Sequence, residues 1–396
     1  MNLEERLREI SWRYSDFWNY YQENLEFCMD ENTAKKFICD YFQAASKENV
    51  VTDWLKIIGE DDRLRYTHSV IAFFIGILLQ HTIDKNMCVI TEERGNNRYP
   101  FSYLWFLTCL AHDIGYQCEI VSGNEIKNMQ SQLMKRSNYR TNILLENYAY
   151  QQLRDKKIVV PHSSRKSHCR FGVVGKKRRV PLRIRGERGY SFRYNDSDMK
   201  VKPWYSDKLE NDYFKYRFWC MDVVDHGIAG ADYLYEKLCQ NYEEQYKDNR
   251  ATGNHIAFYN EDGNYFSESQ KEVYAYIADC VAAHNIFKAE NSWDLKKLYM
   301  SYNLGELLPE NFRKIDYKMD PLLFILCIAD TIEPIKRFSN CKDVLKKVDF
   351  DFHKDNNTLL YYVDENLGTD EERRRYINGV ETLSEWCNVS VKKMER

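Results

Sequence analysis

The sequence lacks the cysteine and glycine patterns on which several common sites depend. Its 12 cysteines include no pair spaced CxxC, and most lie in apolar, helix-like stretches, as Cys109 and Cys327 do. They indicate reduced core residues, because a disulfide framework or a zinc ribbon needs paired cysteines. The sequence also has no Walker motif, no GxGxxG and no GxSxG, so it does not support phosphate-loop, dinucleotide-binding or serine-hydrolase chemistry.

No segment has the composition of a membrane span or a targeting peptide. The longest apolar run, 70–79, is about half of what a bilayer needs. The first residues have no apolar stretch flanked by basic residues. We therefore expect a cytoplasmic protein that does not act at a membrane. The 44% of apolar residues excludes a disordered or collagen-like chain and is enough for a large core.

Charge is distributed unevenly along the 396 residues. The 57 Lys and Arg against 60 Asp and Glu give a net charge of -3. Residues 154–188, here called the basic segment, hold 13 basic and 2 acidic side chains, a net of +11, which leaves -14 for the other 361 residues. Such a segment can bind the phosphates of a nucleotide or a nucleic acid. It can equally be a solvated loop that pairs with acidic surface.

Apolar periodicity predicts a mainly α-helical protein. Residues 1–60 have the pattern of three short amphipathic helices, and 61–117 and 220–340 are strongly helical and apolar. Between them, 118–219 begins with a helical pattern over 125–154. It continues as a basic stretch with the β-branched residues, Gly and Pro that are typical of hairpins or loops.

The order of these segments predicts one helical core that is interrupted by a long, partly β insertion and extended at both ends. The predicted parts are an N-terminal extension (1–60), the core (61–345) with its basic insertion (118–219), and a small C-terminal α+β appendage (346–396). In the appendage, alternating apolar residues flank the turn signal KDNN, and a helical pattern follows.

Four of the nine histidines and two aspartates lie where apolar helices are expected to begin or end. They are His68, His112, Asp113, His226, His284 and Asp330. A single such histidine is more often a hydrogen-bonded core residue than a ligand. Six polar groups in apolar surroundings are costly to bury unless something binds them together. Metal ions would satisfy several of them at once.

Local signals around Asp330 predict an open space beside its carboxylate. Asp320 and Pro321 are a good N-cap and first-turn pair for the apolar helix that carries Asp330. Pro334 has no N–H, so the helix should kink or stop there.

Further motifs surround these residues in a fixed order. They are RxxHS at His68, LxHD at His112 and Asp113, DHGxxGA at His226, and ADxIEPxxR at Asp330. The set resembles the HD superfamily of metal-dependent phosphohydrolases and is most similar to the branch that contains bacterial diadenosine-tetraphosphate hydrolases. The resemblance covers 61–117 and 220–340. It departs from the HDxGK pattern, because Tyr116 follows Gly115.

The resemblance implies an HD-domain helical bundle that holds two divalent transition-metal ions. The implied ligands of the first ion are His68, His112, Asp113 and Asp330; those of the second are His226 and His284, with Asp113 as the bridge. Mixed imidazole and carboxylate ligation suits transition metals. The resemblance favours iron or manganese as the metal over magnesium, nickel, cobalt or zinc. Two ions would activate a water for attack on phosphorus, and we expect Asp113 and His226 to act in the reaction itself.

Cations near the metal ligands are candidates for binding phosphate. Arg65, Lys336 and Arg337 could flank the site or could be ordinary surface charges. Glu333 could orient a ligand histidine or could pair with Arg337. In the basic segment the candidates for substrate binding are Lys176, Lys177, Arg178 and Arg179.

Three functions fit this sequence. The first is hydrolysis of a phosphoester or phosphoanhydride bond in a nucleotide or another phosphorylated small molecule, by a metal-activated hydroxide. The second is a nuclease of the same superfamily that binds single-stranded nucleic acid through the basic segment. The third is a module that senses or binds a nucleotide without catalysis. An oligomer is compatible with each of the three.

Overall fold

The computed structural model describes most of the chain, with its largest gap at residues 128–170. The described residues are 2–13, 30–57, 64–85, 87–91, 98–116, 127, 171–174, 178–181, 190, 192–194, 200–251, 268–339 and 343–394. Over these residues the protein is mainly α-helical with small sheets, which confirms the predicted mainly α class. The helix predicted for 125–154 lies outside the described residues, apart from Lys127.

The described residues of the N-terminal extension form three short helices, in agreement with the prediction. They are α1 (Leu3–Arg13), α2 (Glu31–Ala44) and α3 (Glu48–Ile57). Asp30 caps α2, since its carboxylate accepts hydrogen bonds from free N–H groups of the first turn. The ring of Phe37 packs 5.9 Å from that of Phe74, and Phe42 packs 5.3 Å from Phe106. The N-terminal helices therefore extend the core of the protein.

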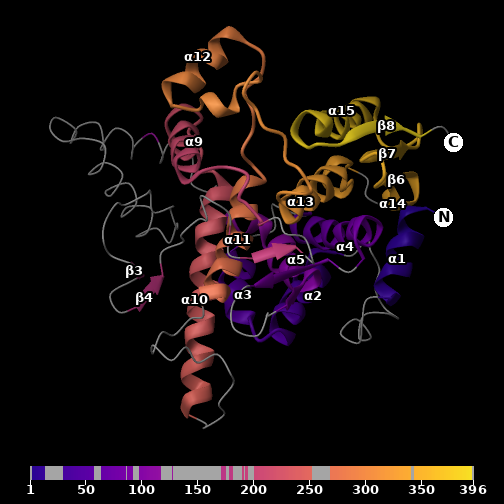
Figure 1. The fold of residues 1–396 in the computed structure, drawn as a ribbon. Helices are drawn as coiled ribbons and strands as arrows, with labels where there is room; N and C mark the ends of the chain where they lie inside the picture. Colours follow the sequence, from indigo (N-terminus) through magenta and orange to yellow (C-terminus); the bar gives the residue numbers. More distant parts are fainter. Residues whose placement is uncertain are drawn as a thin grey trace.

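The core is a bundle of apolar helices joined by a short 3₁₀ turn (Figure 1). Its elements are α4 (Arg65–Ile83), α5 (Phe101–Cys109), η2 (His112–Gly115), α10 (His226–Ala251), α11 (Glu268–Ala283) and α13 (Pro321–Ile332). Helix α4 contacts α2, α5 and α13, and α10 contacts α11 and η2. The indole N–H of Trp105 on α5 donates to the carbonyl of Phe73 on α4, at 2.8 Å.

Among the described helices, α4 alone is long and apolar enough to cross a bilayer, judged by length and composition. However, 83% of its apolar window is buried inside the protein. The central helix of a bundle meets the same criteria of length and composition, and this is the position that α4 has here.

The turn η2 lies directly against the first turns of α10. A methyl group on Gly115 would overlap the carbonyl oxygen of His226 and would lie 2.6 Å from the backbone nitrogen of Gly230. Glycine is therefore needed for this approach. His112 and Asp113 were expected at the end of a helix, whereas α5 ends at Cys109 and the pair lies in a 3₁₀ turn. The tight packing brings this pair next to His226.

Helix α13 begins and ends where its sequence predicts. Asp320 is the N-cap, and its carboxylate accepts a hydrogen bond from the Leu323 N–H. Pro321 occupies the first turn, where the lack of an N–H costs nothing. The helix ends at Ile332, and after Pro334 the chain forms the short 3₁₀ helix η4 (Ile335–Arg337).

The buried Asp320 predicts that stability depends on pH. Burial raises the pKa of Asp320 to about 7, against about 3.9 in an unfolded chain. Between these values the folded state binds more protons than the unfolded state, so the free energy of unfolding should fall as pH rises. Asp320→Asn keeps an N-cap acceptor but cannot titrate. Between pH 5 and pH 8, the free energy of unfolding of Asp320→Asn should therefore rise by about 2 to 3 kcal/mol relative to that of the parent. Urea unfolding of both proteins at the two pH values tests this, and a pH-independent difference would refute it.

Two strands of a small antiparallel sheet lie within 61–117, a segment that was predicted as strongly helical and without strands. The strands of the sheet, in the order β2-β1-β5, are β2 (Arg98–Pro100), β1 (Cys88–Thr91) and β5 (Phe192–Tyr194). Val89 of β1 is opposite Tyr194 of β5. These strands are three or four residues long, too short for a clear alternation of apolar and polar residues. The sheet joins the insertion to the core.

The insertion contains both a hairpin and a helix. Strands β3 (Phe171–Val174) and β4 (Arg178–Pro181) pair antiparallel, in agreement with the β character predicted for the basic stretch. The helix α9 (Asp207–Cys220) was not predicted. It is capped by Ser206, and its Tyr216 ring packs 4.9 Å from Tyr299 of α12 (Trp293–Ser301). Figure 1 shows α9 and α12 at the same end of the bundle.

The appendage has the predicted α+β form. After the short 3₁₀ helix η3 (Gly305–Leu307) and α13, the chain forms α14 (Val344–Lys347), β6 (Val348–His353), β7 (Thr358–Val363), α15 (Asp370–Trp386) and β8 (Ser390–Lys393). Strands β6 and β7 form an antiparallel hairpin around KDNN, and β8 pairs parallel with β7. Helix α15 contacts α13 and lies above it in Figure 1. The appendage therefore reaches the end of the helix that carries Asp330.

Candidate metal centre

Six side chains from five parts of the core lie close together in one cluster. His68 lies in the first turn of α4, His112 and Asp113 in η2, His226 at the start of α10, His284 directly after α11, and Asp330 in the last turn of α13. Within the described residues they form three groups whose ligand atoms lie within 4.8 Å of one another. The groups are His68, His112 and Asp113; His112, His284 and Asp330; and Asp113, His226 and His284. Each of these groups could hold a metal ion.

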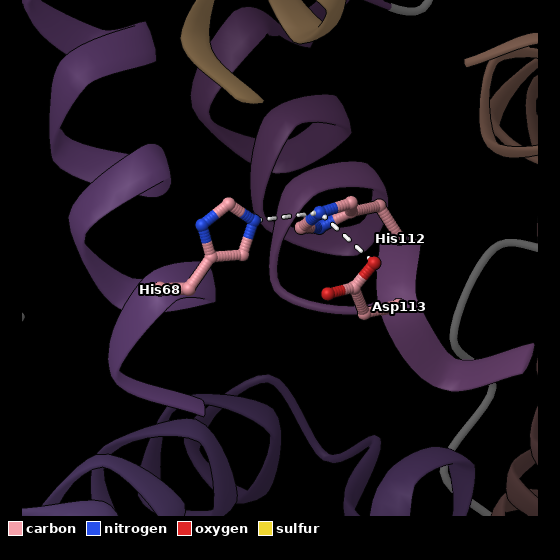
Figure 2. A group of neighbouring side chains, drawn as sticks. All are labelled: His68, His112 and Asp113. Atoms are coloured by element: carbon pink, nitrogen blue, oxygen red, sulfur yellow. Dashed lines mark hydrogen bonds and ion pairs between the residues drawn. The ribbon is translucent and has the colours of Figure 1, made fainter. Parts of the chain in front are cut away.

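Two histidines face each other at the centre of the cluster. Figure 2 shows the rings of His68 and His112 pointing toward one another, with Asp113 beside His112. The Nε2 atoms of the two rings are 3.3 Å apart. His112 Nε2 is also 3.3 Å from Asp113 Oδ1, and His68 Nε2 is 2.9 Å from Asp330 Oδ1. Four electron-rich groups thus converge on one position, which is unfavourable unless a cation or a proton lies between them.

The other ring nitrogen of each histidine shows which tautomer the protein imposes. His112 Nδ1 lies 2.6 Å from the carbonyl oxygen of Cys109, and His284 Nδ1 lies 2.5 Å from that of Val281. A carbonyl oxygen only accepts hydrogen bonds, so Nδ1 must carry the proton in both rings. In the neutral form Nε2 then has the lone pair. Fixing Nδ1–H on a backbone carbonyl is the usual way in which proteins orient a metal-binding histidine.

Glu333 has the same role toward His68. Its carboxylate is fully buried and lies 2.5 Å from His68 Nδ1. It also accepts hydrogen bonds from the backbone N–H groups of Ile335 and Lys336, at 2.7 and 3.4 Å. Of the two roles proposed for Glu333, its position is that of a residue orienting a histidine. The Nε2 atom of His68 is thereby directed at the cluster.

Loss of the Glu333 contact should weaken metal binding. Glu333→Ala removes the acceptor that orients His68, and such changes typically cost 10- to 100-fold in metal affinity. Glu333→Gln keeps an acceptor but removes the charge, so its effect should be smaller. Calorimetric titration with Mn²⁺ measures both. Glu381→Gln is the control, because that carboxylate binds Tyr361 outside the cluster and should not alter affinity. An unchanged affinity in Glu333→Ala would refute the orienting role.

His226 is held differently from the other three histidines. Its ring stacks on Tyr116, with centroids 3.8 Å apart and planes 17° apart. Its Nδ1 lies 3.5 Å from the side-chain nitrogen of Asn285, which is a donor at the long limit of a hydrogen bond. The same Asn285 nitrogen lies 2.9 Å from Asp225 Oδ2. This contact does not fix a proton on Nδ1 of His226, in contrast to the contacts of His112 and His284.

The electrostatics of the cluster favour a cation. Although burial opposes ionisation, His112 and Lys336 hold the pKa of Asp113 well below its usual range. In the same way, His112 and His68 lower the pKa of Asp330 against the effect of burial. Burial, with His226 and His112 nearby, lowers the pKa of His284 to about 3. Ionised carboxylates and a neutral imidazole are the forms that bind metal ions.

Two of the predicted phosphate-binding cations lie beside the cluster. Lys336 Nζ is 2.8 Å from Asp113 Oδ2. The exposed Arg337 lines, with Lys336, a cavity beside the cluster that is described below. The guanidinium of Arg65 lies over the ring of Tyr116, 3.2 Å from its centroid. The sequence prediction missed Tyr116, although its position directly after HDIG marked it as unusual.

Of the four candidates in the basic segment, the structure describes only the backbone of two. Lys176 and Lys177 lie outside the described residues. Arg178 and Arg179 belong to β4, where they pair with β3. The backbone of β4 lies near α10.

A cavity of about 320 Å³ opens beside the six residues. Asp113, His226, His284 and Asp330 lie in its wall. Its remaining lining comes from Tyr116 directly after η2, from the end of α13, from η4, from the segment after α11 and from one side of α15. The cluster is thus buried but accessible from this cavity.

Comparison with known proteins does not identify the chain. The family models, the curated proteins and the solved structures contain no match to it. The capacity to bind a metal ion is therefore inferred from the positions of these His and Asp side chains alone. The donor set fits a divalent transition metal, because it combines neutral imidazoles with carboxylates.

Proposed function

We propose that the protein is a metal-dependent phosphohydrolase of the HD superfamily that cleaves a phosphoester or phosphoanhydride bond in a nucleotide-type substrate. The observation that carries this proposal is the convergence of His68, His112 and His284. Each has its Nδ1 bound to a carbonyl or carboxylate oxygen, and each has a ligand atom in one of the groups that also contain Asp113 or Asp330.

The residues of the cluster would hold two divalent ions, with iron or manganese the first candidates. His68, His112, Asp113 and Asp330 would hold one, and His226 and His284 the other. Asp113 belongs to groups that contain both sets of histidines, as a bridging ligand must. When bound, such ions supply a water of lowered pKa as the nucleophile and neutralise phosphoryl charge.

The protein itself would bind and orient the phosphate. The ammonium of Lys336 lies 2.8 Å from the Asp113 carboxylate, and Lys336 lines the cavity. A phosphoryl oxygen in the cavity could therefore replace that carboxylate as the partner of the ammonium. Arg337, on the same turn, adds a second cation. His226 also lies in the wall of this cavity, so as a ligand of the second ion it would hold that ion beside the bound phosphate.

The basic segment favours a second candidate, a nuclease for single-stranded nucleic acid, because its net charge of +11 suits a polyanion. Purified protein supplied in turn with Mn²⁺, Fe²⁺ and Mg²⁺ should be assayed on nucleoside phosphates, dinucleoside polyphosphates, cyclic nucleotides and oligonucleotides. Metal-dependent hydrolysis of small nucleotides supports the first function. Preference for longer oligonucleotides, with strong salt dependence that Lys176→Ala and Lys177→Ala reduce, supports the second. Absence of hydrolysis with every metal and substrate would overturn both and leave a binding module.

A further inference from the structure

Helix α15 contains a glycine that its own stability does not explain. The helix has 17 residues and a complete capping box formed by Thr369 and Glu372. A glycine inside a helix is destabilising relative to alanine, because glycine loses more backbone freedom on folding. Gly379 lies near the middle of α15, and a methyl group there would meet no atom within 4 Å. Packing therefore does not require glycine at this position. Gly379 lines the cavity described above, and its lack of a side chain leaves space open there.

One side of α15 lines that cavity. Gly379, Thr382, Leu383 and Trp386 all lie in the wall, and their spacing of three and four residues puts them on one face of the helix. The ring of Trp386 meets Phe287 edge to face, with centroids 4.6 Å apart. Phe287, which also lines the cavity, keeps 36% of its surface exposed. The cavity therefore has an aromatic, partly uncovered wall.

The same cavity is lined by the cations Lys336 and Arg337 and by the side chains of the cluster. A ligand that satisfies both kinds of surface has a flat apolar ring and an attached phosphate. The volume of about 320 Å³ is near the lower end of ligand-binding pockets. That size suits one nucleoside unit better than a nucleic-acid strand.

We propose that the cavity is the base-binding subsite of the hydrolase, with the base against Phe287 and Trp386 and the phosphate toward Lys336 and Arg337. The inference rests on the proposed function for its reaction, but it concerns binding and can be measured without turnover. It makes the appendage part of the substrate site. It also gives Gly379 a role, because a bulky side chain such as Leu would fill the space that the base occupies.

A matched pair of ligands tests the subsite in the full chain. The probes are α,β-methylene-ADP and methylenediphosphonate, which share the P–C–P group that resists hydrolysis and differ in the nucleoside. Titration calorimetry with Mn²⁺ present should show the nucleoside-bearing probe binding more tightly by about tenfold or more, because only its base can stack on the aromatic side chains. Gly379→Leu should remove most of this advantage and leave methylenediphosphonate within about twofold of the parent. Gly379→Ala, which adds one methyl group, should keep most of it.

The helix should tolerate both substitutions, because Leu and Ala are better helix formers than Gly. If Gly379→Leu does not fold, Thr382→Leu fills the cavity from an exposed position on the same face and should give the same loss. Equal binding of the two probes by the parent would overturn the inference. The inference would also be overturned if Gly379→Leu and Thr382→Leu weakened the binding of both probes equally, or weakened the binding of neither. These results do not depend on hydrolysis, so a failure of the subsite is distinguishable from a failure of the proposed reaction.

Discussion

Asp113→Ala should lose bound metal and reduce hydrolysis by about 10³-fold or more. Asp113 belongs to the group with His68 and His112 and also to the group with His226 and His284. Its removal therefore leaves two sets of imidazoles without the carboxylate that neutralises a cation. It also leaves the Lys336 ammonium without its partner at 2.8 Å. Elemental analysis of the purified variant and its kcat on the best substrate measure the two effects.

Asp349→Ala is the matched control for Asp113→Ala. Asp349 is also a buried aspartate paired with a cation, since its Oδ1 lies 2.9 Å from Arg6 Nη1. The pair joins α1 to β6 and contains none of the clustered residues. Asp349→Ala should lower stability while metal content and kcat stay near those of the parent. If Asp113→Ala kept its metal or its rate, Asp113 would not be a bridging ligand.

Gly115→Ala should separate η2 from α10 and thereby disrupt the site from the backbone. The added methyl group would overlap the carbonyl oxygen of His226 and press on the backbone of Gly230. Backbone atoms cannot rotate away as a flexible side chain does, so the two elements must move apart. We expect a loss of stability of about 1 to 3 kcal/mol, as for other overpacked cores. The group of Asp113, His226 and His284 should lose its metal.

Thermal unfolding and metal analysis of Gly115→Ala measure these effects. Gly305→Ala is the control, because a methyl group there would lie 3.5 Å from Met300 Sδ, an ordinary contact distance. Its midpoint of unfolding should differ little from that of the parent, and its metal content should be unchanged. Full metal content in Gly115→Ala would show that the spacing of η2 and α10 does not determine the site.

Features with a short-range signal could be predicted from the sequence. Asp320 and Pro321 marked the start of α13, and Pro334 marked the break after it. These signals are local, because a cap or a missing N–H acts within one helical turn. The six clustered residues could be singled out for a similar reason, since each polar residue lies in a conspicuously apolar stretch.

Features that depend on distant segments could not be predicted. The contact of Glu333 with His68 joins residues 265 positions apart, and the sequence offered a pairing with Arg337 equally well. Strand β5, within the insertion, is only three residues long and pairs with β1, which lies about 100 residues earlier in the chain. Gly379 had no local pattern that marked it. Its significance comes only from the cavity that α15 borders, and that cavity is formed by tertiary packing.

Tyr116 lies between these two cases. Its position after HDIG was visible in the sequence as a departure from the HDxGK pattern. Its partners were not visible, because Arg65 and His226 come from α4 and α10. The cation Lys336, from η4, lies 5.9 Å from the Tyr116 ring and contacts Asp113 directly. A lysine from a distant segment thus lies beside His112 and Asp113, although the residue directly after Gly115 is a tyrosine.

Metal stoichiometry tests the central claim most directly. Protein purified from cells supplied with iron and manganese should contain close to two transition-metal ions per chain. The double variant His226→Ala, His284→Ala should contain about one, because His68, His112, Asp113 and Asp330 remain. A parent protein without bound transition metal, or a double variant with the full content of the parent, would contradict a two-metal centre at these residues.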